Sequence, residues 1–225
     1  MSKNKLFRFA EMKKMEHVLE PSMEEIKNGA VDYKGNWNKA IFKNDNPITL
    51  ELGCGKGEYA VGLAKKYPNK NFIGVDIKGA RMWVGAKQCV EEGIENVVFL
   101  RTKIDFIDKL FDRNEVDEIW LTFSDPQPNK PNKRLTSKIF IDRYRKILKP
   151  GGIIHLKTDS DVLFESTENE IKEHGYNCTY FTWDLYNDIQ KMPDNIKDIL
   201  HIKTHYEELF TQRGHQIKYC QFYIN

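Results

Sequence analysis

The sequence lacks long apolar stretches. No run in its 225 residues approaches the roughly 20 apolar residues that a membrane-spanning helix needs. The segment from Met1 to Phe9 also lacks the apolar centre of a secretory signal. We therefore expect a cytoplasmic protein that does not bind a membrane.

Cysteine and histidine are too sparse to indicate a metal site. The four cysteines, Cys54, Cys89, Cys178 and Cys220, lie far apart and form no C-x-x-C pair. Such spacing favours reduced, buried thiols over disulfides, zinc or redox chemistry. The six histidines show no metal-ligand spacing either. We therefore expect no metal.

The chain also lacks a large excess of one charge. Its 35 basic and 33 acidic residues give a formal net charge of +2, too small by itself to indicate a nucleic-acid partner. Basic residues nevertheless gather in two places. One cluster, opposed only by Asp142, comprises Lys130, Lys133, Arg134, Lys138, Arg143, Arg145, Lys146 and Lys149. The other, in the N-terminal arm, comprises Lys3, Lys5, Arg8, Lys13 and Lys14. Solvated faces or phosphate-binding surfaces would both account for them.

The most informative run has Glu51 at the end of an apolar strand, followed by Gly53, Gly55 and Gly57. Glycine allows a sharp turn and a close approach of the backbone to a ligand. The dinucleotide motif G-x-G-x-x-G does not fit, because Glu58 stands where its third glycine is required. Two opposite charges about 4 Å apart are worth roughly 4 kcal/mol at an effective dielectric near 20. Glu51 therefore favours S-adenosylmethionine, which carries a sulfonium and an ammonium, over a pyrophosphate.

A second acid, Asp76, ends the next apolar strand. It stands roughly as far beyond the glycines as the acid that binds a ribose diol in nucleotide-binding folds. Both cofactor classes use such an acid, so Asp76 supports a nucleoside site without choosing between them. The structural alternatives are Glu51 as a solvated strand end and Asp76 as the cap of a helix near Gly79.

Short apolar strands alternate with helical patterns from residue 48 onward. We expect strands at residues 48–52, 71–76, 97–101, 118–123 and 152–157. Helical patterns fall at residues 57–66, 79–92, 105–112 and 137–148. The alternation predicts an α/β fold with a mostly parallel, doubly wound, Rossmann-like sheet. We divide the chain into a basic N-terminal arm with a leading segment, residues 1–45, and one domain, residues 46–225.

The clearest expected helix covers residues 137–148. We expect Thr136 to cap it and the face with Ile139, Phe140 and Tyr144 to pack, leaving cations on the other face. Beyond it, strands at residues 178–183 and 217–224, separated by an irregular polar segment, would close one sheet edge as an antiparallel pair.

The segment after the fourth expected strand places Asp125 between that strand and a proline, in the order F-S-D-P-Q. Lys130, Lys133 and Arg134 follow it. In such sheets ligands bind beyond the carboxyl ends of the strands, so Asp125 is poised over a pocket. We expect Lys133 and Arg134 to contact phosphates, because they follow this segment directly.

These motifs together resemble those of the bacterial tRNA (guanine-N7-)-methyltransferases, which modify a guanine in the tRNA variable loop. Besides the glycine turn, they are F-x-D-P at residues 123–126, L-K-P-G-G at 148–152 with T-D at 158–159, and T-x-[FY]-E at 204–207. The resemblance implies a class I S-adenosylmethionine-dependent methyltransferase fold, S-adenosylmethionine as the methyl donor and tRNA as the partner. It leaves the oligomeric state open.

The resemblance also implies a role for each matching residue, with Asp125 as the catalytic one. The residues implied at the methyl donor are Glu51, Asp76 and Asp125, to which we add Gly53 and Gly55 of the glycine turn and, as substitutes for a missing acid, Ile104 and Asp105. Those implied at the guanine are Asp125, Asp159, Thr204, Tyr206 and Glu207. For the tRNA we add Lys130, Lys133 and Arg134, which follow Asp125 in the sequence.

Three positions depart from the family pattern. Gln127 stands where an aromatic is common, and Asn129 where a substrate-contacting Lys is expected, so that Lys130 would take its place. The acid usual after the third strand is Lys103 here, and Asp105 or the backbone near residue 104 would substitute for it.

The implied chemistry needs no general base, because guanine N7 bears a lone pair and no proton. Carboxylates would stabilise the positive charge that appears on the purine. Two other functions stay open: an amino-group nucleic-acid methylase, because residues 124–127 partly match D-P-P-[YF], and a non-catalytic RNA-binding protein with a relic nucleoside pocket. Singly, Asp159 could cap a helix near Val162, Glu207 could be an exposed helical acid and Tyr206 a core aromatic.

Overall fold

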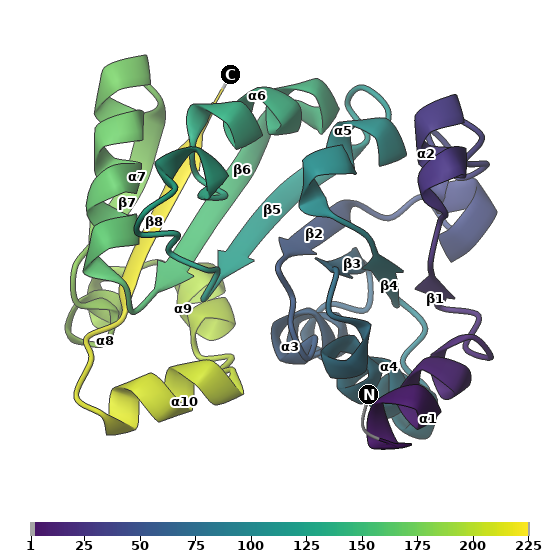
Figure 1. Cartoon of the computed structure of the whole chain (residues 1–225). Coiled ribbons are helices and arrows are strands. Elements are labelled where there is room, and N and C mark those ends of the chain that lie inside the picture. Colours follow the sequence, from purple (N-terminus) through teal and green to yellow (C-terminus); the bar gives the residue numbers. More distant parts are fainter. Residues whose placement is uncertain (1–2, 225) are drawn as a thin grey trace.

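The computed structural model describes residues 3–224, so the parts of the expected arm and domain at residues 1, 2 and 225 lie outside the described residues. Its centre is an eight-stranded sheet (Figure 1). The strands are β1 (Val18–Leu19), β2 (Ile48–Leu52), β3 (Asn71–Asp76), β4 (Val97–Arg101), β5 (Val116–Thr122), β6 (Leu148–Thr158), β7 (Asn177–Thr182) and β8 (Lys218–Tyr223). Their order is β1-β4-β3-β2-β5-β6-β8-β7. The pairings are parallel, except that β8 runs antiparallel to both β6 and β7.

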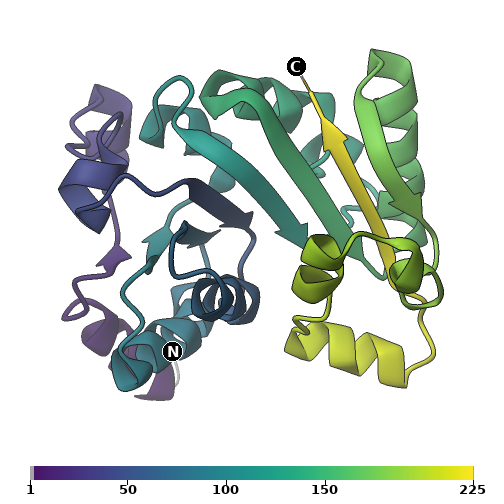
Figure 2. The same ribbon diagram turned by 180° about the vertical axis from the view of Figure 1, so that it is seen from behind.

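Helices cover both faces of the sheet (Figures 1 and 2). The α-helices are α1 (Lys3–Met12), α2 (Met23–Asn28), α3 (Glu58–Lys66), α4 (Gly79–Glu92), α5 (Ile107–Leu110), α6 (Lys138–Ile147), α7 (Asp161–His174), α8 (Leu185–Asp188), α9 (Asp194–Leu200) and α10 (His205–Gln212). Short π and 3-10 turns are η1 (Asn38–Phe42), η2 (Ile104–Phe106), η3 (Pro131–Lys133) and η4 (Ile189–Lys191). None of the helices in residues 3–224 is long and apolar enough to span a bilayer.

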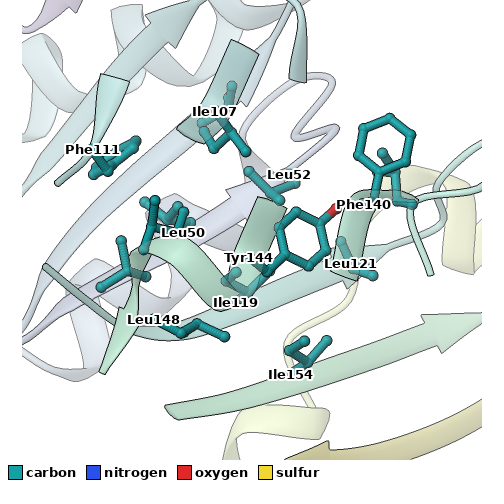
Figure 3. Packing of buried hydrophobic residues seen from close by; sticks show 14 of the residues in the cluster. Leu50, Leu52, Ile107, Phe111, Ile119, Leu121, Phe140, Tyr144, Leu148 and Ile154 are labelled. Carbon is teal, nitrogen blue, oxygen red and sulfur yellow. The ribbon is translucent and has the colours of Figure 1, made fainter. Parts of the chain in front are cut away.

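Buried apolar side chains form two clusters that correspond to the two faces. On one face, Leu50 of β2 and Ile119 and Leu121 of β5 pack with Phe140 and Tyr144 of α6 (Figure 3). Helices α2, α5 and α7 add side chains to this cluster. Each large side chain fully buried in this way contributes roughly 1.5–3 kcal/mol to the free energy of unfolding. The central strands therefore read as continuous apolar runs, as expected for strands covered on both faces.

The second cluster lies on the opposite face. Tyr59 and Leu63 of α3 and Met82 of α4 pack there with Trp120 of β5 and Leu200 of α9. Helix α10 lies beyond the carboxyl ends of β5 and β6, and both views place it below their arrowheads (Figures 1 and 2). The two clusters fix the strands of the sheet, and α10 is held by polar contacts, among them Glu207 with Lys157 of β6.

The predicted α/β class, with a mostly parallel sheet and an antiparallel C-terminal edge, is confirmed. Strands β2, β3 and β4 have the bounds expected from the sequence. Strand β5 begins earlier, at Val116, and ends at Thr122 because Phe123 adopts a left-handed backbone with φ 49°. All four cysteines are free, and only Cys178 is partly exposed.

Several local predictions are wrong. Ser137, not Thr136, occupies the N-cap of α6, and the buried Thr136 hydroxyl accepts a hydrogen bond from Thr167 of α7 at 2.8 Å. Ile139 is 45 % exposed. The buried side chains of α6 are those of Phe140, Ile141, Tyr144 and Ile147, so the packed face does not include Ile139.

Two expected segments also differ from the structure. The helix at residues 105–112 ends at Leu110, because Phe111 is extended and stacks on Trp37 at 4.8 Å. The segment expected to be irregular contains α8, α9 and α10, and Thr204 caps the last of them by accepting from Glu207 N.

The N-terminal segment joins the fold. Strand β1 extends the sheet beside β4, and α1 packs on α4. Arg8 Nη1 donates to the Ala80 carbonyl at 2.8 Å, and Trp83 Nε1 donates to Glu11 at 2.8 Å. A two-residue strand and a polar helix have too little apolar periodicity to be predicted from sequence.

Candidate active site

A cavity of about 770 Å³ opens at the carboxyl ends of the parallel strands. It brings together most of the residues that the sequence singled out: Glu51, Gly53, Gly55, Asp76, Ile104, Asp105, Asp125, Lys130, Lys133, Asp159, Thr204 and Tyr206. Arg134 and Glu207 are absent from the described residues that line it. Twelve of the fourteen residues that the sequence predicted for the site therefore line one cavity, and Arg134 and Glu207 do not.

The glycine turn after β2 is held by Asp76. Gly55 has φ 56° and its N–H donates to Asp76 Oδ2 at 2.9 Å, while Asp76 Oδ1 accepts from Lys78 N at 2.8 Å. Gly57 has φ 75°, and a Cβ there would lie 2.4 Å from the Phe99 ring. A side chain at either position would force a left-handed L-residue, so the turn needs glycine. Asp76 thus holds the turn by hydrogen bonds and also lines the cavity. It is not the cap of α4, because Lys78 occupies the N-cap position.

Glu51 is 3 % exposed, so it is not a solvated strand end. Its Oε1 accepts from Thr122 Oγ1 at 2.6 Å and its Oε2 from Ala60 N at 2.9 Å. Burial, with a smaller contribution from the neighbouring Glu58 and Asp76 carboxylates, raises the pKa of Glu51 to about 7, although those two hydrogen bonds oppose the shift. A cation entering the cavity would relieve this unfavourable negative charge.

We call residues 123–129, which follow β5, the acceptor segment. Two of its residues have a left-handed backbone, Phe123 with φ 49° and Gln127 with φ 44°. Between them Asp125 is exposed at the cavity, and its Oδ1 accepts from Gln127 N at 3.0 Å. The Ser124 hydroxyl is buried in the cavity wall without a hydrogen-bond partner among the described residues. Strained backbone of this kind costs about 1–3 kcal/mol per residue and persists where surrounding contacts fix it.

Arg134 supplies one such contact. It is 9 % exposed, and its Nε donates to the Pro126 carbonyl at 3.0 Å, so it supports the acceptor segment from behind. Lys130 and Lys133, in contrast, are exposed, and Lys133 Nζ lies 3.4 Å from Asp105 Oδ1 across the cavity rim.

Asp159 lies at the end of β6 and faces the cavity. Burial raises the pKa of Asp159 above its usual range, and the nearby His215 and Lys218 oppose this effect. The alternative role as a helix cap is excluded, because Ser160 caps α7 by accepting from Leu163 N.

Glu207 is fully buried, so it is not an exposed helical acid. Its Oε1 lies 2.8 Å from Lys157 Nζ and accepts a short hydrogen bond from Tyr186. Lys157 Nζ also donates to the Leu200 carbonyl at 2.8 Å, and burial lowers the pKa of Lys157 to about 8 against the attraction of Glu207. The pair ties α10 to β6, which places Tyr206 at the cavity.

Phe123, Tyr206 and Phe210 form an aromatic wall, with ring centroids 6.3 Å apart for Phe123 and Phe210 and 6.1 Å apart for Tyr206 and Phe210. Of these three, only Phe210 was not predicted from the sequence. Tyr206 is therefore a wall residue and not a core aromatic. Phe210 lies one helical turn after Tyr206, a spacing that could have identified it. Glu58 and Arg81 join the site only through the packing of α3 and α4.

The basic cluster at residues 130–149 is largely paired with acids. Lys138 lies 2.5 Å from Asp142, and Lys146 lies 2.6 Å from Asp108. Lys149 pairs with Asp117 at 2.7 Å. The solvated-face interpretation therefore holds for much of α6, whereas Lys130 and Lys133 line the cavity. In residues 3–224 no three His, Cys, Asp or Glu side chains are arranged to hold a metal ion.

Solved structures share this fold. One is the 16S rRNA methyltransferase KamB, with a TM-score of 0.59 and 11 % identity over 82 % of this chain and 90 % of that chain. Another is a 30S ribosomal A1408 methyltransferase from an uncultured bacterium, with a TM-score of 0.59 and 16 % identity over 84 % and 93 %. The fold is that of the class I S-adenosylmethionine-dependent methyltransferases.

Sequence comparisons narrow the class to a family. A family model described as "Putative methyltransferase" matches residues 45–220, close to the domain start chosen from the sequence. A tRNA (guanine-N(7)-)-methyltransferase of Bacteroides fragilis (strain YCH46) is 54 % identical over all of this chain and 87 % of its own. The enzyme of that name from Bacillus subtilis (strain 168) is 37 % identical over 83 % of this chain and 84 % of its own. The chain belongs to the tRNA (guanine-N7-)-methyltransferase family.

Proposed function

We propose that this chain transfers the methyl group of S-adenosylmethionine to N7 of a guanine in the variable loop of tRNA. One observation carries the proposal: Glu51, Asp76, Asp125 and Asp159 meet in a single cavity at the carboxyl ends of the strands. Family membership supports the same reaction. We also propose that the enzyme works in the cytoplasm, where its tRNA substrate is found.

The residues of the cavity fit the methyl donor. The glycine turn leaves open space, since the nearest atom to a Cβ at Gly55 would be a carbonyl oxygen 4.0 Å away. Glu51, Glu58 and Asp76 supply carboxylates to the donor half of the cavity, where Lys56 and Lys78 also line the wall. We propose that Asp76 binds the ribose hydroxyls and that Glu51 attracts the positively charged methionine part, with residues 102–105 beside the adenine.

The donor supplies an electrophilic methyl group on a sulfonium sulfur. Guanine N7 attacks with its own lone pair, so no residue has to remove a proton. We propose that Asp125 and Asp159 accept hydrogen bonds from guanine N1–H and the amino group and stabilise the positive charge that develops on the purine. Asp125, between the donor and acceptor halves, fixes the geometry of both, and positioning supplies the rest of the acceleration.

For the tRNA we propose that Lys130 and Lys133 bind phosphates, because both are exposed at the rim. For Arg134 and Glu207 we propose positioning roles in place of direct contact. Arg134 would hold the acceptor segment through Pro126, and Glu207 would hold α10 through Lys157. Thr204 would act both as the cap of α10 and as a wall of the guanine site.

Incubation of the purified protein with labelled S-adenosylmethionine and unmodified bulk tRNA tests the proposal. We expect label in 7-methylguanosine when the digested tRNA is analysed by mass spectrometry. Label in an N2- or N6-methylated base would indicate an amino-group methylase instead. Tight tRNA binding without label would indicate the RNA-binding protein with a relic pocket.

A further inference from the structure

Arg81 stands in the cavity without a role in the reaction described so far. It belongs to the first turn of α4, whose backbone is held by α1 because Arg8 Nη1 donates to the Ala80 carbonyl at 2.8 Å. Its side chain is exposed, lines the cavity, and places its guanidinium carbon 5.7 Å from the centre of the Tyr206 ring. Arg81 therefore reaches from the donor side of the cavity to the wall of the acceptor side.

The guanidinium has no acid to neutralise it. In residues 3–224 no carboxylate lies within 4.0 Å of Arg81, although Glu58 and Asp76 line the same cavity. Arg101 and Arg134 differ from it in this respect: Arg101 pairs with Glu20 at 2.9 Å, and Arg134 donates to Pro126. Five N–H donors in a planar fork are thus left at the cavity mouth, and such a fork matches an oxyanion.

The ring under Arg81 is fixed. Tyr206 stacks with Phe210, and Phe210 faces Phe123, the residue at which the acceptor segment begins. Helix α10 is held at its start by His205 N donating to Glu58 at 2.9 Å. A guanidinium over an aromatic ring keeps its N–H groups at its edge, free for other acceptors. The contact therefore orients the donors of Arg81 beside the aromatic wall.

We propose that Arg81 binds the phosphate of the target guanosine, with Tyr206 holding its guanidinium in place. The inference rests on the proposed function, because it needs an RNA nucleotide in the acceptor half of the cavity. The carboxylate of the methyl donor is the other oxyanion that enters this cavity. Arg81 favours the RNA because it contacts the wall formed by α10, whereas the donor half is built from the glycine turn and Asp76. Arg81 is thus a third cation for RNA at the cavity besides Lys130 and Lys133.

Three variants test the proposal. Arg81→Ala removes the fork, Arg81→Lys keeps the charge without the planar donors, and Arg113→Ala removes an exposed cation that does not line the cavity. Since Arg81 is exposed on a helix, we expect all three to unfold at the temperature of the original protein. For each, kcat and KM for tRNA, the dissociation constant of S-adenosylmethionine, and the salt dependence of tRNA binding are measured.

Arg81→Ala should lower kcat/KM for tRNA by about tenfold to a hundredfold, the range for losing a charged hydrogen bond. The slope of log affinity against log salt should fall by roughly 0.7–0.9. Arg81→Lys should restore the slope but only part of kcat/KM, and Arg113→Ala should match the original protein. The affinity for S-adenosylmethionine should change less than about twofold in every variant, a difference worth under roughly 0.4 kcal/mol.

Two results would overturn the proposal. Weaker S-adenosylmethionine binding with unchanged tRNA affinity would assign Arg81 to the donor carboxylate, and unchanged values throughout would leave it a solvated cation. Both are distinct from failure of the proposed function, in which the original protein itself would form no 7-methylguanosine.

Discussion

At the scale of single residues, the site depends on carboxylates whose surroundings differ. Glu51 is buried with two hydrogen bonds, Asp159 is half-buried, and Asp125 is exposed on a strained turn. The buried acid carries an unfavourable charge that a cation relieves, whereas the exposed acid is free to meet the acceptor. Burial thus distinguishes the acid that we propose for donor binding from the acid that we propose for contact with the base.

Protonation of Glu51 should make the affinity for S-adenosylmethionine depend on pH. Burial raises the pKa of Glu51 to about 7, so the free protein takes up a proton there as the pH falls below 7. A cationic donor favours the ionised carboxylate, so its affinity should be highest above pH 7 and should fall toward tenfold per pH unit below it. Calorimetric titration with S-adenosylmethionine between pH 5.5 and 7.5, at roughly half-unit steps, measures this change.

Glu51→Gln is the matched control, because it keeps the shape of the side chain without the charge. Its donor affinity should be weaker at pH 7.5 and nearly flat toward pH 5.5, within roughly twofold. A slope in the variant equal to that of the original protein would assign the pH dependence to another group.

At the scale of elements, two segments hold the acceptor half. Arg134 holds the turn after β5, and the Lys157–Glu207 pair holds α10. Removing one partner of a buried pair leaves an uncompensated charge, typically costing 3–5 kcal/mol. The elements that we propose to meet the base are therefore held by groups that do not line the cavity.

Substitution of the two cations after β5, Lys133 and Arg134, should have different effects on tRNA binding and on stability. Lys133→Ala should reduce the salt slope of tRNA binding by roughly 0.7–0.9, because it removes an exposed phosphate contact. Arg134→Ala should leave that slope unchanged but lower kcat and the unfolding temperature, because it frees the Pro126 carbonyl and the turn. Filter binding over a range of salt concentrations and thermal unfolding measure the two effects. Equal loss of slope in both variants would show that Arg134 reaches the RNA as expected from the sequence.

Element bounds followed from local pattern wherever apolar periodicity was strong. Strands β2, β3 and β4 and helix α4 were predicted to the residue, because each carries an uninterrupted apolar pattern. The helices between β7 and β8 were missed because the segment is polar and is stabilised by side-chain caps such as Thr204 and by the buried Glu207. Caps and buried ion pairs depend on contacts that a window of sequence does not contain.

At the scale of the whole molecule, the parallel order of the sheet makes the site. Strands β2 to β6 end at one edge, so acids far apart in the sequence meet there. This rule of parallel sheets made most of the site predictable from Glu51, Asp76, Asp125 and Asp159. Residues brought in by helix packing, such as Arg81, were not predictable, because their position depends on how α4 and α10 face one another.

The central claim is that Asp125 serves the methyl transfer and not the binding of the RNA. Asp125→Asn keeps the shape of the side chain and removes its charge, and Asp32→Asn removes an exposed acid that does not line the cavity. The most direct measurement compares single-turnover methylation of tRNA with the dissociation constant of the same tRNA for both variants. The account predicts that Asp125→Asn loses about a hundredfold or more in the rate of transfer while its tRNA affinity stays within about twofold. A rate equal to that of Asp32→Asn would contradict it.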